Sequence, residues 1–139
     1  MATSKKILIN TSNAPSFSSM PFNQAVVLDN TIYVSGVLGV NKDTMKLVDD
    51  DFTSEVRQTL KNLKAILEAG SSSLEKVVKV TVFLSDINDF AAMNEVYREF
   101  FTKDFPARTA IVAAKLPLNA RVEIDAIGAT GQVKTVCCH

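Results

Sequence analysis

The segment 105–127 constrains the fold most strongly, because it contains two strand-like runs separated by turn-forming residues. Residues 109–114 are apolar and partly β-branched, and residues 116–119 interrupt the run with a proline and an asparagine. In residues 120–127 apolar and charged residues alternate strictly, which is typical of a strand with one buried face. The pattern predicts a β-hairpin with a tight turn.

Three charged residues share the polar face of the second predicted strand: Arg121, Glu123 and Asp125. Charged groups on an otherwise apolar strand need water, a partner or a ligand. Arg108 stands at the mouth of the predicted hairpin, soon after Pro106. We therefore expect the hairpin to form the floor of a small-molecule site, with the rest of the chain as its support.

The remaining elements follow from hydrophobic periodicity. Strands are expected over 5–9, 24–28, 31–38 and 77–84, and helices over 52–69 and 87–101. The order β-β-β-α-β-α-β-β predicts one α+β domain over residues 1–139, with two helices on one face of a six-stranded sheet. Residues 128–139 have no pattern and are predicted to form a flexible tail.

The helix ends and the buried face of the second helix are also predicted. Asp51 is expected to cap the N-terminus of the first helix, and Gly70 is expected to be its C′ residue. The buried stripe of the second helix is expected to contain Phe90, Met93, Tyr97 and Phe100.

The second face of the sheet remains without a covering element. Apolar residues are predicted on it at Tyr33, Val37, Phe83 and Ile127. Leaving apolar surface in water costs roughly 25 cal/mol per Å². We therefore expect this face to pack against further copies of the chain in a closed homo-oligomer.

The composition disfavours several classes of partner. The chain has 15 Lys and Arg and 15 Asp and Glu, so that it has no net charge to attract nucleic acid. No apolar run reaches the length of a membrane span, and residues 1–10 do not have a signal-peptide pattern. Cys137 and Cys138 are adjacent, which is too close for an ordinary disulfide, and a reducing, cytoplasmic location is expected. With His139 they form only a poor candidate set for a metal ion, so no metal site is predicted.

Several short motifs, in order and at compatible spacing over nearly the whole chain, resemble the signature of the Rid (YjgF/RidA) family. The motifs are Asn13-Ala14-Pro15, Gln24-Ala25-Val26, Tyr33-Val34-Ser35-Gly36, Asn88-Asp89-Phe90, Asn94 with Tyr97, Phe105-Pro106-Ala107-Arg108-Thr109, Ala114-Lys115-Leu116-Pro117 and Val122-Glu123-Ile124. The sequence looks most similar to the animal members, the perchloric-acid-soluble proteins.

The resemblance implies a chorismate-mutase-like α+β fold with a six-stranded mixed sheet, and a homotrimer with clefts between subunits. It implies hydrolytic deamination of 2-iminobutanoate and 2-iminopropanoate to 2-oxo acids and ammonia, without a cofactor. Some family members are described as ribonucleases or translation inhibitors, which is a second implied function. The neutral charge and the single histidine of this chain speak against that alternative.

The resemblance also implies roles for individual residues. Arg108 matches the arginine that holds the substrate carboxylate, a task that suits a planar guanidinium with two parallel donors. Glu123 matches the acid beside the attacking water, which a carboxylate can orient and deprotonate. Residues that line the family's cleft are matched by Phe22, Ser35, Gly36, Phe90 and Asn94.

Three positions depart from the family pattern. Phe22 stands where a tyrosine is usual, Val37 where a glutamine is usual and Ala110 where cysteine is frequent. Losing one positioned donor typically costs on the order of 10²–10³ in rate when it acts in the transition state. The sequence leaves three alternatives open: an attenuated enzyme, a non-catalytic binding protein with the same trimer, and a structural Arg108 that merely pairs with Asp125.

Overall fold

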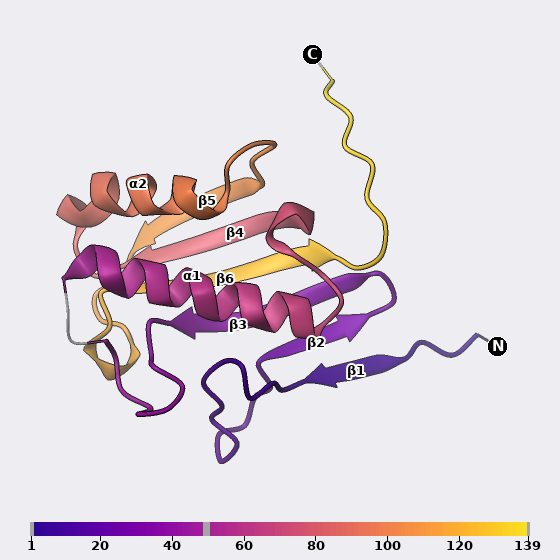
Figure 1. Ribbon diagram of the computed structural model, residues 1–139, viewed down its shortest axis with the longest axis horizontal. Helices are drawn as coiled ribbons and strands as arrows, with labels where there is room; N and C mark the ends of the chain where they lie inside the picture. Colours follow the sequence, from indigo (N-terminus) through magenta and orange to yellow (C-terminus); the bar gives the residue numbers. More distant parts are fainter. Residues whose placement is uncertain (1, 49–50, 139) are drawn as a thin grey trace.

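A single six-stranded mixed sheet organises the computed structural model, which describes residues 2–48 and 51–138. The strands are β1 (Lys6–Ile9), β2 (Ala25–Leu28), β3 (Thr31–Leu38), β4 (Val77–Leu84), β5 (Ala107–Val112) and β6 (Val122–Ala129). The helices are α1 (Phe52–Ala69) and α2 (Phe90–Phe100), with the 3₁₀ turns η1 (Leu74–Lys76), η2 (Ile87–Asp89) and η3 (Pro117–Asn119). The predicted element order is confirmed (Figure 1).

The strand order β1-β2-β3-β6-β4-β5 shows that the predicted hairpin is wrong. β5 pairs in parallel with β4, and β6 lies between β3 and β4, antiparallel to both. The connection over 113–121 includes η3, with positive φ angles at Leu118 and Asn119. Such a connection is longer than the two-residue turns that force consecutive strands to pair, so β6 passes β4 and takes a central position.

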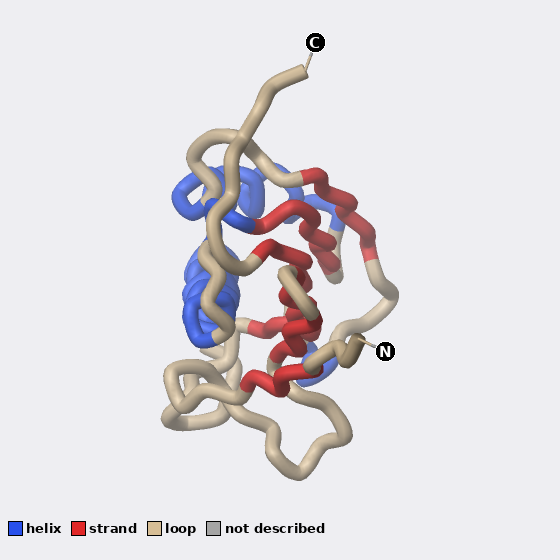
Figure 2. Tube along the Cα trace, turned by 90° about the vertical axis from the view of Figure 1, so that its right-hand side faces the viewer, coloured by secondary structure: helices blue, strands red, loops and turns tan. Residues whose placement is uncertain are grey.

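Both helices cover the same face of the sheet, as predicted, and the core lies between them and the strands (Figure 2). Alternate residues of β6 point into this core, among them Val122, Ile124 and Ala126. α1 contributes Leu60, Leu63 and Leu67 from its inner side. The strict alternation of β6 therefore does predict its buried face, although its strand neighbours are not those of a hairpin.

A β-bulge in β3 changes which side chains face the core. The register with β6 shifts between Val34 and Val37, and both of these valines are buried. The extra residue inverts the alternation, so that Val37 faces the core and not the open face of the sheet. The prediction that Val37 lies on the open face is therefore wrong, and Ser35 and Gly36 lie within the irregular stretch.

The helix ends agree with the sequence in part. Asp51 caps α1 as predicted, because its carboxylate accepts a hydrogen bond from the Ser54 N–H at 2.9 Å. Gly70 has a φ of −95°, and the left-handed residue is Ser71 with a φ of 63°. Gly70 is needed for a different reason, since a Cβ there would collide with Ile32 Cδ1.

The predicted buried stripe of α2 is also correct only in part. Met93, Val96 and Tyr97 are buried, whereas Phe90 is 36% exposed and Phe100 is half-buried. Phe90 is the first residue of α2, and its ring centre lies 5.7 Å from the Arg108 guanidinium carbon.

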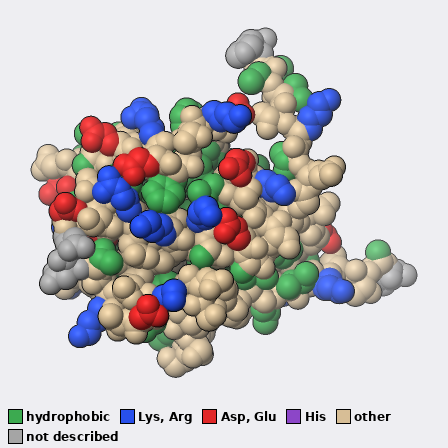
Figure 3. Space-filling view, in the orientation of Figure 1, with side chains coloured by type: hydrophobic (Ala, Val, Ile, Leu, Met, Phe, Trp, Pro, Cys, Tyr) green, Lys and Arg blue, Asp and Glu red, His purple; other side chains and the backbone are tan. Residues whose placement is uncertain are grey.

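The open face of the sheet carries exposed apolar side chains. Tyr33 is 46% exposed and Ile111 45%, while Phe83 and Ile127 are half-buried. On the helix-covered side, in contrast, basic and acidic side chains are distributed over the surface (Figure 3). Apolar groups at this density on one sheet face are typical of an interaction surface.

The chain ends in a segment without regular structure. β6 continues to Ala129, two residues beyond the predicted end of this strand at residue 127, and residues 130–138 contain no helix or strand. Figure 1 shows this segment leading away from the sheet. Within residues 2–48 and 51–138, no helix has the length and hydropathy needed to span a bilayer.

Candidate functional site

Glu123 reaches from β6 over the bulge of β3. It is paired with Leu38 on one side and Phe83 on the other, and its side chain is half-buried. A Cβ at Gly36 would lie 2.8 Å from the Glu123 carboxyl carbon and closer to one oxygen, so a larger residue there would force the carboxylate to move. Burial raises the pKa of the Glu123 carboxyl, and the negative charge of Asp125 raises it further.

The loop before β2 closes one side of this region. The Ser35 hydroxyl donates a hydrogen bond to the Asn23 carbonyl at 2.7 Å. The Gln24 side-chain amide donates to the Pro15 carbonyl at 2.8 Å and accepts from the Thr11 N–H at 2.6 Å. Buried Gln24 thus fixes the loop. The Ser35 hydroxyl, which was predicted to line the cleft, also bonds to this loop.

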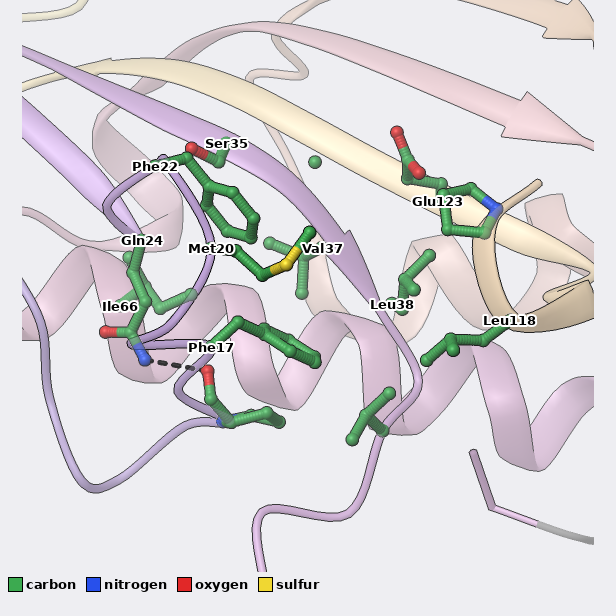
Figure 4. A pocket seen from close by; sticks show the side chains of 14 residues that line it. Phe17, Met20, Phe22, Gln24, Ser35, Val37, Leu38, Ile66, Leu118 and Glu123 are labelled. Atoms are coloured by element: carbon green, nitrogen blue, oxygen red, sulfur yellow. Dashed lines mark hydrogen bonds between the residues drawn. The ribbon is translucent and has the colours of Figure 1, made fainter. Parts of the chain in front are cut away.

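These elements enclose a pocket of about 640 Å³, which we call the Glu123 pocket. It is lined by Pro15, Phe17, Met20, Phe22, Gln24, Ser35, Gly36, Val37, Leu38, Val40, Ile66, Pro117, Leu118 and Glu123. Figure 4 shows Phe17, Met20 and Phe22 gathered at one end, with Leu38, Leu118 and Glu123 at the other. The lining is mostly apolar, and Glu123 is its one acidic residue.

Arg108 lies in a second pocket of about 210 Å³, which we call the Arg108 pocket. It is lined by Asn94, Tyr97, Arg98, Phe105, Pro106 and Arg108. The guanidinium carbon of Arg108 is 4.8 Å from the centre of the Tyr97 ring and 5.7 Å from that of Phe90. Two aromatic rings of α2 therefore hold the cation by cation–π contacts.

The guanidinium of Arg108 has no hydrogen bond or ion pair within the part of the chain that the structure describes. In particular, Arg108 does not pair with Asp125, which was the structural alternative for this residue. Arg108 is paired with Val80, which is buried under the helices, whereas Asp125 is paired with Thr81 on the opposite face. The Arg108 side chain is thus half-buried, held in place and available to an anion.

The folded chain does not bring the two predicted catalytic residues together. Glu123 shares its face of the sheet with Phe83, while Arg108 shares the helix-covered face with Val80. The predicted cleft residues divide in the same way, with Phe22, Ser35 and Gly36 beside Glu123, and Asn94 and Phe90 beside Arg108. The predicted site is therefore split between two separate pockets of the chain.

One of the three charges predicted on the hairpin floor has a structural role. Arg121 precedes β6, and its Nε donates to the buried Glu55 carboxylate of α1 at 2.7 Å. The N–H groups of Arg121 and Val122 donate to the other oxygen of Glu55 at 2.7 and 3.3 Å. This cluster fastens the start of β6 to α1, so the face above it presents Glu123 and Asp125.

Several lining residues were not predicted as site residues. Tyr97 was predicted only as part of a family motif and of the buried stripe of α2, and Arg98 was not predicted. They follow Asn94 by three and four positions, a spacing that places all three on one side of α2 and could have indicated them. Phe17 and Leu118 belong to irregular segments, for which periodicity gives no signal.

The structure also locates Val37 and Ala110, the other two positions that depart from the family pattern. Val37 lines the Glu123 pocket from within the core, and Ala110 is exposed on β5 opposite Val82. Among the described residues, no group of three or more His, Cys, Asp or Glu could hold a metal ion, and His139 lies outside the described residues.

Comparison with known proteins agrees with this architecture. The RutC family protein UK114 of Drosophila melanogaster is 53% identical over 135 residues, which are 97% of each chain. The 2-iminobutanoate/2-iminopropanoate deaminase of Capra hircus is 43% identical over 135 residues, 97% of this chain and 98% of the relative. The crystal structure of E. coli TdcF with bound serine is 35% identical, with a TM-score of 0.85 over 90% of this chain and 99% of that one.

The family model "Endoribonuclease L-PSP" matches residues 11–130. This range contains every strand from β2 to β6, both helices and both pockets. The family resemblance in the sequence motifs is therefore confirmed, and the chain belongs to the Endoribonuclease L-PSP family, which includes the Rid proteins.

Proposed function

We propose that this chain hydrolyses small 2-imino acids, of the 2-iminobutanoate and 2-iminopropanoate type, to 2-oxo acids and ammonia. The observation that carries the proposal is Arg108, a half-buried guanidinium held by two rings with no acid partner among the described residues. Such a group suits a small carboxylate. The deaminase name of the goat relative and the serine bound to TdcF, which also has an α-carboxylate, support this substrate class.

We propose a homotrimer, because the two pockets complement each other across copies. Arg108 can fix a carboxylate but has no acid nearby, and Glu123 can handle a proton but has no cation in its pocket. The exposed apolar face with Tyr33 and Ile111 supplies a surface for association. A closed ring of three copies would place the Arg108 pocket of one copy against the Glu123 pocket of the next.

In the proposed reaction, Arg108 holds the carboxylate and Glu123 accepts a proton from water as its oxygen attacks the imine carbon. The proton passes to nitrogen, and the resulting tetrahedral carbinolamine collapses to the 2-oxo acid and ammonia. Imine and water are consumed in equal amounts, and no electron acceptor is needed. The raised pKa of Glu123 makes its carboxylate a stronger proton acceptor than an ordinary glutamate, which suits a general base.

A second candidate function is metabolite binding without turnover. Phe22 lacks a hydroxyl, and the Ser35 hydroxyl is engaged with the Asn23 carbonyl, so the Glu123 pocket has few free donors for a developing charge. This alternative keeps the trimer and the role of Arg108 in binding. It differs only in the absence of catalysis.

The test is release of 2-oxobutanoate when threonine dehydratase supplies the imine, after subtraction of spontaneous hydrolysis. We expect the wild type to accelerate release and Arg108→Ala to lose the acceleration, with the trimer intact by sedimentation. Arg57→Ala is the matched control, because Arg57 pairs with Glu99 on the outer surface of the helices. Equal rates for wild type and Arg108→Ala would contradict the assignment, and binding without acceleration would favour the second candidate.

A further inference from the structure

Tyr97 has a buried hydroxyl group without a partner. The residue is 4% exposed, and its hydroxyl is the one buried side-chain nitrogen or oxygen in residues 2–48 and 51–138 that makes no hydrogen bond. A buried hydroxyl without a partner destabilises a fold, and most native structures avoid it. The exception therefore requires an explanation.

The surroundings of Tyr97 point to an anion. Its ring is stacked on Phe101 on one side, with centroids 4.6 Å apart, and lies 4.8 Å from the Arg108 guanidinium carbon. Tyr97, Arg98 and Arg108 line the same pocket, whose lining residues include no acid. The pocket is consequently cationic, and an anion bound in it would offer the acceptor that the hydroxyl lacks.

The protonation state of Tyr97 is suitable for this purpose. Burial raises the pKa of the Tyr97 hydroxyl, and the nearby charge of Arg108 opposes part of that change. The hydroxyl therefore stays protonated at neutral pH and can act as a donor. A carboxylate held by Arg108 would supply both the negative charge and the free lone pairs that this donor lacks.

We propose that Tyr97 is a second binding residue for the ligand carboxylate. Its ring orients the Arg108 guanidinium, and its hydroxyl donates a hydrogen bond to a carboxylate oxygen when the ligand is bound. This inference rests on the proposed function in that Arg108 holds a carboxylate. It adds that the free protein keeps a destabilising, unpaired donor for its ligand.

Tyr97→Phe removes the hydroxyl and keeps the ring. We expect it to increase the stability of the free protein and to weaken substrate binding. Without ligand, the variant no longer buries an unpaired donor, so its Tm should rise by a few degrees. With substrate, KM should increase about 10-fold or more, as for a lost bond to a charged group. The carboxylate is bound in both ground and transition states, so kcat should change little.

The experiment measures Tm, KM and kcat by the coupled assay, and the Kd of 2-oxobutanoate by calorimetry. The set contains wild type, Tyr97→Phe, Tyr97→Leu and the control Arg57→Ala, which changes an exposed side chain on the outer surface of the helices. Tyr97→Leu also removes the ring, so it should have a higher KM and Kd than Tyr97→Phe. Arg57→Ala should leave KM and Kd unchanged.

Two outcomes would overturn the inference. A Tyr97→Phe variant with a lower Tm and unchanged KM and Kd would mean that the hydroxyl bonds a neighbouring subunit or water in solution. A higher Tm with unchanged KM and Kd would mean that it bonds no ligand. Failure of the proposed function gives a different result. If wild type shows no turnover but Tyr97→Phe weakens the binding of 2-oxobutanoate, the proposed activity is wrong and the carboxylate site is supported. If wild type neither turns over the imine nor binds 2-oxobutanoate, both proposals fail.

Discussion

The Glu123 pocket and the Arg108 pocket are built in different ways. The first depends on irregular backbone: a bulge in β3, the bare Gly36 and a loop fixed by Gln24. The second depends on the regular spacing of α2, which sets aromatic rings beneath Arg108. One is apolar with a single acid, and the other is cationic. The proposed proton-transfer group and the proposed anion-binding group therefore have independent structural supports, so single substitutions should affect them separately.

The largest expected separation is in Glu123→Gln. Removal of a general base typically lowers kcat by about 10²–10⁴-fold. Since the Arg108 pocket is untouched, the Kd of 2-oxobutanoate should remain close to that of wild type. Calorimetry and the coupled assay together test this, and the division of roles fails if kcat is kept while Kd weakens.

Gly36→Ala tests whether the bare backbone is what positions the acid. The added methyl group overlaps the Glu123 carboxylate and must displace it. A displacement of about 1 Å can cost on the order of 100-fold in rate, so kcat should fall by about that much. Gly131→Ala is the control, because nothing lies within 4 Å of a Cβ there. An active Gly36→Ala variant would show that the carboxylate position is not critical.

The pH dependence of kcat should identify the Glu123 pocket as the source of the proton acceptor. Glu123 must be ionised to accept a proton, so kcat should rise as pH increases through its raised pKa. Asp125→Asn removes the neighbouring negative charge and should shift the acid limb to lower pH. A pH profile that Asp125→Asn leaves unmoved would assign the limb to another group.

The same shift has a consequence for stability. The pKa of Glu123 is higher in the folded chain, so the folded state favours the protonated acid, and stability is lost as pH rises through that pKa. Glu123→Gln, which is neutral at every pH, should therefore have a higher Tm than wild type at neutral pH. The difference should shrink on acidification, and thermal melts at several pH values would contradict this if the two proteins kept a constant difference.

The smallest expected effect is in Phe22→Tyr, which returns a hydroxyl to the Glu123 pocket. If the pocket is active but attenuated, kcat should increase by a few-fold, within the range of a single positioned donor. Phe17→Tyr is a matched control, because its ring lies 6.2 Å from that of Phe22 in the same pocket. Equal gains in both variants, or no gain in Phe22→Tyr, would remove Phe22 as the cause of attenuation.

Periodicity predicted the regular part of the fold well. The helix over Phe52–Ala69 and the strands over Thr31–Leu38 and Val77–Leu84 have the expected bounds, because each has a long and consistent pattern. The pairing of β5 with β6 was predicted wrongly, because neighbours in sequence pair only when the connection is short. No local sequence pattern indicates that β6 pairs with β3 and β4 and not with β5.

The same distinction holds for the site. The residues around Arg108 could be found from the spacing of Asn94 and Tyr97 on one helix. The placement of Val37 was wrong because a bulge inverts the alternation, and periodicity alone does not register the bulge that Gly36 could have indicated. The unpaired hydroxyl of Tyr97 depends on packing in three dimensions, which no linear pattern encodes.

The place of β6 in the sheet has a consequence for how the chain is made. The sub-sheets β1-β2-β3 and β4-β5 share no ladder with each other, and the strand that joins them is the last to be synthesised. During translation both remain with a bare edge facing where β6 will insert, and such edges invite aggregation. We infer that cooperative folding waits for β6 to leave the ribosome, so truncation within β6 would leave β1-β2-β3 and β4-β5 without a shared ladder and would destabilise the fold.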